Sequence, residues 1–206
     1  MCKFQRYNCN PWGKSTGDCT IRAVLAGSLY GYKYLCEEFG VKNDFEYGIG
    51  LKDGVPLKNI KTFSDKTGII TSYDLELTDD MTISQFEYQK AMQFNGFKIS
   101  FWMDNLKLDK TNSKIIFICK KRPYDTIDKE SDTVDYHTVY GNLKTRTIYD
   151  TWDSRDCVVI DSYIVSKTAK PEDDHYYKND FIEMKKEYEK NISILNDLFK
   201  NIKSKK

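Results

Sequence analysis

The segment 10–30 is the most restrictive feature of the sequence, because it places a cysteine at the start of a nearly uncharged helix. Two glycines mark a loop, and Asp18 is a common residue type at a helix N-terminus. From Cys19 onward, apolar residues lie on two stripes of a helical pattern, and Arg22 is the only charged residue among them. Such a helix is enclosed by protein on most sides. The rest of the chain must therefore fold around it.

Cys19 falls in the first turn of this helix, where a thiol becomes more acidic. Unpaired backbone N–H groups and the positive end of the helix dipole stabilise the thiolate, which is the reactive form. Cysteine is also common as a small buried apolar residue, so the segment alone leaves both interpretations open. Arg22 lies one turn later and can face Asp18 or the thiol. An i,i+4 spacing favours a structural ion pair with Asp18.

The charge balance bears on the class of partner. The chain has 206 residues, with 32 Lys and Arg against 31 Asp and Glu, and a net charge of +1. Nucleic-acid binding by phosphate neutralisation requires a basic excess, so no nucleic-acid partner is expected. The sequence has no apolar run of membrane-spanning length, and its first residues lack the apolar core of a signal peptide. We therefore expect a cytoplasmic protein with no membrane partner.

Six cysteines are scattered along the chain without a CxxC pair or a histidine at metal-ligand spacing. They are Cys2, Cys9, Cys19, Cys36, Cys119 and Cys157. In a chain without an export signal, this pattern indicates reduced thiols. We expect no disulfide framework, no metal site and no cofactor.

The order of elements predicts an α+β fold. Helices are expected from Cys19 onward and at 34–39, 56–67 and 79–94, with short strands at 3–7 and 69–77. Further strands are expected at 97–103, 114–121, 134–140, 145–149 and 157–165. Because most helices precede these strands, we expect an N-terminal helical lobe packed on a twisted, antiparallel C-terminal sheet. The segments 40–54 and 122–132 are predicted loops and candidates for setting specificity.

A long helix is predicted at 179–202, with an apolar stripe that must be buried. Packing on its own domain is the first expectation, and a partner or a homodimer contact is the alternative. The division of the chain is accordingly a domain at 1–170 and a C-terminal helical appendage at 171–206.

His137 is the second candidate for chemistry. A thiol nucleophile needs a base, and the base needs an acceptor that fixes its tautomer and orientation. A turn predicted at Gly141–Asn142 puts His137 and Asp150 on the two arms of one hairpin. Asp153 is a rival acceptor three residues later. His175, the other histidine, lies in a polar linker.

Cys19 at a helix tip, His137 on a strand and the motif Asp150-Thr151-Trp152 resemble the papain-like cysteine peptidase superfamily, in which the last motif is Asn-Ser-Trp. More closely, NPWGKSTGDCTIRAV and YDTWDS are similar to a group of small phage-associated papain-like proteins. The resemblance covers residues 8–30 and 134–165. It implies a papain-like fold in which the helix beginning at Cys19 is buried at the centre.

The resemblance also implies roles. Cys19 would be the nucleophile, His137 the general base and acid, Asp150 the orienting acceptor, and Trp152 a shield for the His–Asp hydrogen bond. Gly13 stands where papain-like enzymes have the Gln that donates to the oxyanion. The oxyanion hole would then depend on the Cys19 backbone N–H and an amide such as that of Asn10.

The expected function is a thiol hydrolase that cleaves a peptide or isopeptide bond through an acyl-enzyme intermediate. Its substrate would be a protein or peptide of the host or the phage, in the host cytoplasm if the chain is phage-encoded. A deamidase or transglutaminase-type acyl transferase is one alternative. A catalytically inactive papain-like binding module is the other, and the missing Gln favours it.

Overall fold

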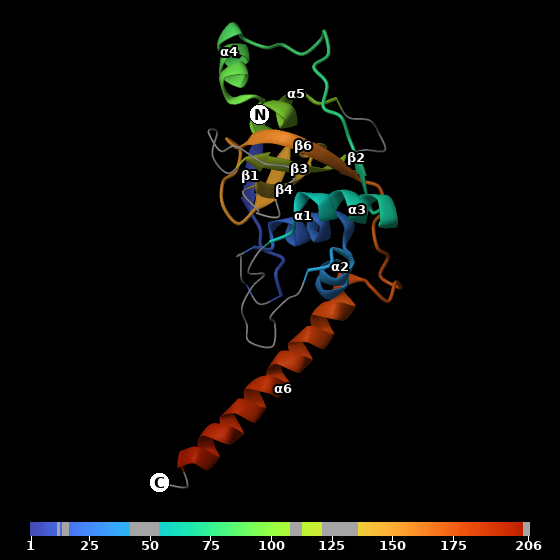
Figure 1. Cartoon of the computed structure of the whole chain (residues 1–206), viewed down its shortest axis with the longest axis vertical. Helices are drawn as coiled ribbons and strands as arrows, with labels where there is room; N and C mark the ends of the chain where they lie inside the picture. The colour runs from blue at the N-terminus through green and yellow to red at the C-terminus, as the bar shows by residue number, and fades with distance from the viewer. Residues whose placement is uncertain (12, 14–16, 42–53, 108–112, 121–135, 204–206) are drawn as a thin grey trace.

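The computed structural model describes residues 1–11, 13, 17–41, 54–107, 113–120 and 136–203. In this part of the chain, one sheet is flanked by helices on both faces (Figure 1). The strands are β1 (Lys3–Arg6), β2 (Ile70–Ser72), β3 (Lys114–Lys120), β4 (Tyr136–Asn142), β5 (Thr147–Asp150) and β6 (Val158–Val165). The helices are α1 (Cys19–Ser28), α2 (Tyr32–Glu38), α3 (Leu57–Thr67), α4 (Gln85–Phe94), α5 (Ile99–Asn105) and α6 (Tyr177–Lys203).

The sheet is mixed, with strand order β1-β5-β4-β3-β6-β2. Its pairs are antiparallel except for β1 and β5, which run parallel. The α+β class is confirmed, but the prediction of a purely antiparallel sheet built from the C-terminal half is wrong. β1 pairs in register with β5, so that Arg6 lies opposite Asp150. This parallel orientation brings the chain that leads to α1 out at the end of β5.

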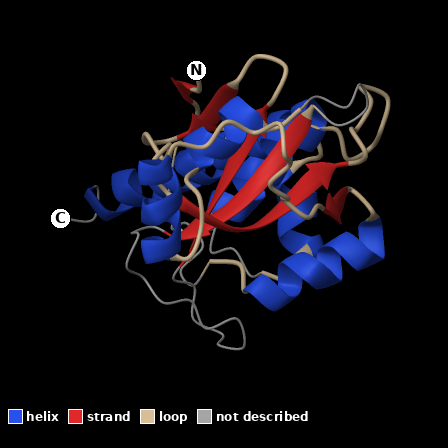
Figure 2. Ribbon diagram, turned by 90° about the horizontal axis from the view of Figure 1, so that it is seen from above, coloured by secondary structure: helices blue, strands red, loops and turns tan. Residues whose placement is uncertain are grey.

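Each face of the sheet carries its own apolar core (Figure 2). On β3, Ile116 and Ile118 pack with α1, α2 and α3 on one face, while Phe117 and Cys119 pack with α5 on the other. Side chains alternate along a strand, so a continuous apolar strand supplies both cores. This explains why β3 has almost no polar position in its interior.

α1 is buried along nearly its whole length, as its apolar pattern with a single charged residue predicts. It ends where Leu29 takes a left-handed conformation, with φ of 63°. The helical extension predicted at 34–39 is a separate helix, α2, which begins after Gly31. A side chain at Gly31 would collide with Asp180 of α6, so this glycine permits the close approach of the two segments.

The strand predicted at 97–103 is wrong, because residues Ile99–Asn105 form helix α5. The segment alternates in hydrophobicity, but Ile99, Trp102 and Met103 also follow the i, i+3, i+4 spacing of a helix face. All three are buried against the sheet. When the apolar residues of a short segment fit both the strand period and the helix period, the sequence does not distinguish strand from helix. Tertiary packing then determines which one forms.

Three further boundaries differ from the prediction. β2 is much shorter than 69–77, since it is an edge strand that pairs only with β6. α4 starts at a capping box formed by Ser84 and Glu87, which excludes residues 79–83 from the helix. Gly141 and Asn142 belong to β4, and the turn follows at residues 143–146. The predicted loop 122–132 and most of the loop 40–54 lie outside the described residues.

α6 leaves the body and projects away from it (Figure 1). Its first turns are anchored, because Met184 is buried in the core beside α1 and α2 and Tyr176 bridges to Tyr30. The predicted helix is confirmed. Packing of its whole apolar stripe on the body is not observed. Within the described residues, no helix is both long and apolar enough to cross a membrane.

Candidate active site

Cys19 is the first residue of α1, a helix that packs mainly on β4, in the interior of the sheet. Thr20, the next residue, shares a hydrogen bond of 2.9 Å with Thr138 of β4, and both hydroxyls are buried. Thr138 in turn follows His137. This neighbouring pair therefore fixes the start of α1 against β4 and brings Cys19 beside His137.

His137 connects the thiol to a carboxylate. Its Nε2 lies 2.6 Å from Asp150 Oδ2, and both side chains are buried. The ring also acts on the Cys19 thiol, through hydrogen bonding and charge that shift the pKa of both groups. Since Nε2 is paired with Asp150, Nδ1 is the ring nitrogen available to the thiol. The structure thus brings together the three residues that the sequence analysis selected.

The electrostatics of the pair favour a thiolate and an imidazolium. Burial acts to raise the pKa of Cys19, but the hydrogen bond and charge of His137, with smaller contributions from Thr138 and Arg22, lower this pKa below its ordinary value. Burial acts to lower the pKa of His137, but the hydrogen bonds to Asp150 and Cys19 raise it to about 10. A thiol of this kind is nucleophilic near neutral pH.

Asp150 is the acceptor, and Asp153 is not. Asp150 is buried, and its second oxygen, Oδ1, accepts the backbone N–H of Thr151 at 2.7 Å. Asp153 is exposed and forms a bidentate pair with Arg155, which lowers the pKa of Asp153. The two carboxylates therefore have separate partners.

Trp152 covers the histidine from the solvent side. Its ring centroid lies 5.0 Å from that of His137, with the planes inclined by 33°. The indole is 43% exposed, so it forms the boundary between the buried His–Asp pair and water. This position agrees with the shielding role that the sequence resemblance implies.

Arg22 joins two carboxylates in the interior. Its Nε lies 2.8 Å from Asp18 Oδ1, which confirms the predicted ion pair. Its Nη1 also lies 3.8 Å from Asp150 Oδ1, a contact that the sequence analysis missed. Asp18 makes no side-chain cap to α1, because its carboxylate is used by Arg22, Asn10 and Tyr32.

Asn10 is engaged with the buried carboxylate of Asp18. Its side-chain amide donates to Asp18 Oδ2 at 2.6 Å and to the hydroxyl of Tyr32 at 3.2 Å. Its backbone N–H donates to Asn8 Oδ1 at 3.0 Å. These contacts give Asn10 a site-supporting role, in which it stabilises the carboxylate that also binds Arg22.

Sequence reasoning missed Tyr32 and the Thr20–Thr138 pair. Tyr32 is fully buried, and its hydroxyl donates to Asp18 at 3.0 Å. Nothing in the local pattern identifies these residues, because Tyr32 belongs to an apolar stripe and the threonines are ordinary helix and strand residues. Only their positions in the fold reveal the contacts.

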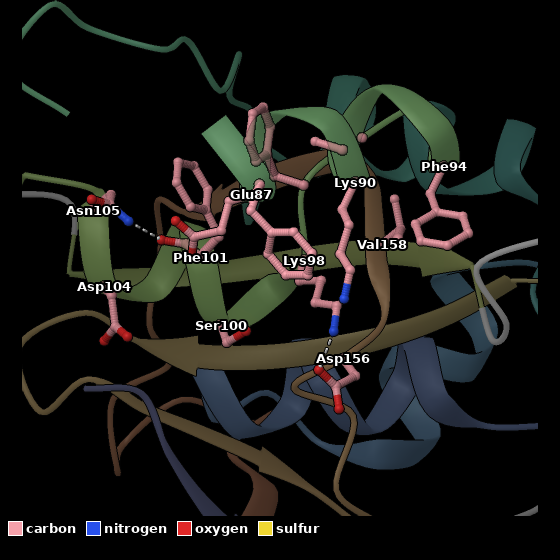
Figure 3. Close-up of a pocket in the computed structure, with 14 residues that line it drawn as sticks. Glu87, Lys90, Phe94, Lys98, Ser100, Phe101, Asp104, Asn105, Asp156 and Val158 are labelled. Carbon is pink, nitrogen blue, oxygen red and sulfur yellow. Dashed lines mark hydrogen bonds and ion pairs between the residues drawn. The ribbon is translucent and has the colours of Figure 1, made fainter. Parts of the chain in front are cut away.

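A pocket of about 340 Å³ lies on the other face of the sheet, between α4, α5 and the start of β6 (Figure 3). Phe94, Phe101 and the ion pair of Lys98 with Asp156 line it, and no residue of the Cys19 site does. Among the residues that the structure describes, no group of three or more His, Cys, Asp or Glu side chains could hold a metal ion. The Cys19 site is therefore the centre with a chemical rationale.

Comparison with known proteins identifies no relative, so the candidate site is assessed from its geometry. His137 interacts both with Cys19 at a helix N-terminus, whose pKa it lowers, and with the buried carboxylate of Asp150. No protein-family model, curated protein or solved structure matches the chain.

Proposed function

We propose that the chain is a papain-like thiol hydrolase that cleaves a peptide or isopeptide bond. The observation that carries the proposal is the arrangement of Cys19 at the N-terminus of α1 with His137, whose ring lowers the pKa of the thiol and pairs with the buried Asp150. Nucleophile, base and orienting acceptor each have the partner that covalent catalysis requires. A buried structural histidine needs an acceptor for its N–H, but it has no need of a thiol on its other nitrogen.

In the proposed reaction, the Cys19 thiolate attacks the carbonyl carbon, and the carbonyl π electrons move to oxygen. As the tetrahedral intermediate collapses, the imidazolium of His137 gives its proton to the leaving amine, and a thioester remains. His137 then takes a proton from water, whose oxygen attacks the thioester carbonyl. The second tetrahedral intermediate collapses with cleavage of the C–S bond, which releases the carboxylic acid and restores the Cys19 thiolate beside the imidazolium. Asp150 holds the ring in the correct orientation throughout, and does not itself accept the proton.

The backbone N–H of Cys19 is the remaining candidate donor to the oxyanion, since Asn10 is engaged elsewhere. First-turn N–H groups have no partner within the helix and point toward a negative charge at its N-terminus. Removing one donor of a hole typically costs about 10²–10³ in rate. We therefore propose a slower enzyme than one that also has a donating Gln.

The proposed substrate is a protein or peptide of the phage or its host, with the cytoplasm as the place of action. An acyl-enzyme can be resolved by water or by an amine, so deamidation and transglutamination use the same three residues. The acceptor of the acyl group distinguishes these reactions. Product analysis by mass would show hydrolysis, loss of ammonia or a new isopeptide bond.

The first experiment measures the alkylation of Cys19 by iodoacetamide at pH 6, followed by intact mass and peptide mapping. We expect Cys19 to react about tenfold or more faster in the wild type than in His137→Ala, because only a paired thiolate is ionised at that pH. Equal rates would contradict the proposal. The other thiols are internal controls, since Cys2, Cys36, Cys119 and Cys157 are buried.

A panel of electrophilic peptide and ubiquitin-like probes then tests substrate class. Labelling at Cys19 by one class of probe, lost in His137→Ala, would support a hydrolase for that class. The engaged amide of Asn10 favours the second candidate, a catalytically inactive papain-like module that binds peptides. Fast alkylation without labelling by any acyl-type probe would support that module.

A further inference from the structure

The C-terminal half of α6 presents an apolar face to solvent. From Lys185 to Ile202, every side chain that the structure describes on this helix is exposed. The apolar ones are 41–63% exposed: Ile192, Ile194, Leu195, Leu198, Phe199 and Ile202. Figure 1 shows this half of the helix far from the sheet and from the other helices. A contiguous apolar face of this kind marks an interaction site, and a helix without tertiary contacts is marginal in water.

The spacing of this face identifies the partner as a helix. One set of residues recurs at intervals of three or four, with one interval of seven that counts as two steps. The repeat therefore averages 3.5 residues, as in a coiled coil. Its members are Phe181, Met184, Asn191, Leu195, Leu198 and Ile202. A helix with this repeat keeps one seam against another helix along its length, whereas a flat surface has no reason to select it.

The polar residues favour a second copy over a membrane surface. The rest of the helix carries both signs of charge, with pairs such as Lys185–Glu189 and Lys200–Asp197, each at 4.0 Å. A helix that lies on a membrane has a largely basic polar face. Asn191 is the one polar member of the seam, and its amide has both donors and an acceptor. It is therefore complementary to the same residue of an identical helix.

The body of the protein limits the arrangement of the two helices. Met184, the second member of the seam, is already buried in the core, so the N-terminal part of α6 is occupied. An antiparallel pair of helices centred on Asn191 would have to pack along the N-terminal part of α6, which the body already covers. A parallel pair joins the two exposed C-terminal halves and places Asn191 of each chain at the same level.

We infer that residues 191–202 of α6 pair in parallel with the same segment of a second copy, as a two-stranded coiled coil with Asn191 facing its counterpart. The two bodies then lie at one end of the coil, with a candidate active site in each. This inference is independent of the chemistry proposed for Cys19.

Sedimentation of the full chain over a dilution series tests the association. We expect a dimer in the wild type, and a rise of at least about a hundredfold in its dissociation constant in Leu195→Asp/Leu198→Asp. Ser193→Asp is the matched control, because residue 193 lies on the opposite side of the helix from the seam. It should leave the constant unchanged. A wild type that is monomeric throughout, or a dimer that survives the double substitution, overturns the inference.

Cross-linking tests the register without depending on a disruptive variant. Asn191→Cys should form a 191–191 disulfide between two chains under oxidised glutathione, identified by mass spectrometry of the linked peptide. Ser193→Cys, also in an exposed position, should not. Equal cross-linking of both variants overturns the parallel seam. A monomer that instead sediments with anionic phospholipid vesicles assigns the face to membranes and also overturns the inference.

Discussion

Arg22 Nη1 lies 3.8 Å from Asp150 Oδ1 in the interior of the protein. The same guanidinium binds Asp18 through Nε at 2.8 Å. Cys19, His137, Asp150, Arg22 and Asp18 thus form a row in which acidic and basic side chains alternate. Arg22 connects the start of α1 to the acceptor of the histidine, and so acts on the candidate site through Asp150.

Replacement of Arg22 by Ala should damage both stability and reactivity. The change leaves the buried carboxylate of Asp18 without its cation and removes the more distant positive charge from Asp150, which keeps His137. Breaking a buried pair costs about 3–5 kcal/mol. Removal of the positive charge should also raise the pKa of the Cys19 thiol. Urea denaturation and the pH profile of Cys19 alkylation measure the two effects separately.

Arg22→Lys should preserve part of the effect of Arg22 on the pKa of the Cys19 thiol. Its ammonium keeps the charge but lacks the planar fork that reaches Asp18 and Asp150 together. We expect an intermediate thiol pKa. Arg155→Ala is the control, because Arg155 forms its ion pair with Asp153 at the surface and should change neither property. If Arg22→Ala left the alkylation profile unchanged, Arg22 would have a structural role only.

The two aspartates of the 150–153 segment should differ sharply in effect. Asp150→Ala removes the acceptor of the His137 N–H and leaves the ring without an orienting partner, a change that can reduce turnover by about 10⁴ in a triad of this type. Asp153→Ala affects only an exposed pair. The measurement is the rate of Cys19 labelling by an acyl-type probe in both variants. Similar losses in both would reassign the orienting residue.

The sequence indicates the site better than it indicates the sheet. Cys19, His137 and Asp150 can be selected from residue chemistry and from the hairpin that connects the last two. The parallel pairing of β1 with β5 is a long-range contact between residues at opposite ends of the chain, and no local pattern contains it. The same holds for the contact of Arg22 with Asp150, which depends on where α1 meets β5.

Local ambiguity explains the remaining differences. Residues 97–103 fit a strand period and a helix period, and their packing against the sheet selects α5. Asparagine is usually exposed, so the sequence does not predict that Asn10 is buried against Asp18 and Tyr32. Buried polar groups find partners that are distant in sequence, and these are the contacts that sequence patterns miss.

The dependence of stability on pH should reveal the ion pair of Cys19 and His137. Their ordinary pKa values are 9.0 and 6.5, and in the folded protein the first is lowered and the second is raised to about 10. The raised pKa of His137 contributes stability that is lost as pH rises toward 10. The lowered pKa of Cys19 contributes stability that is lost as pH falls below 9. Below pH 9, where the folded pair is thiolate and imidazolium and the unfolded pair is thiol and neutral imidazole, each state binds one proton on this pair, so the two effects cancel.

Removal of the thiol should abolish this cancellation. In Cys19→Ala, His137 keeps its bond to Asp150, so the free energy of unfolding should decline as pH rises above about 6.5. In the wild type, the contribution of the pair should stay level until about pH 9. Urea denaturation at several pH values measures both curves, and Cys19→Ala/His137→Ala corrects for all other groups. Parallel curves for the wild type and Cys19→Ala would show that no ion pair forms.

Truncation of the chain should separate the two halves of α6. A chain ending at Pro171 loses Met184 and Tyr177, which pack in the core beside α1 and α2, and buried side chains of this size contribute about 1.5–3 kcal/mol each. A chain ending at Lys190 keeps these contacts, and every residue it loses whose burial the structure describes is exposed. We therefore expect a lower melting temperature for the first truncation, by about 2–4 °C for each kcal/mol lost in a chain of this size, and little change for the second when both are compared as monomers. Thermal unfolding at a protein concentration below the dimer dissociation constant makes that comparison. Equal melting temperatures for the two truncations would mean that the first turns of α6 add nothing to the stability of the body.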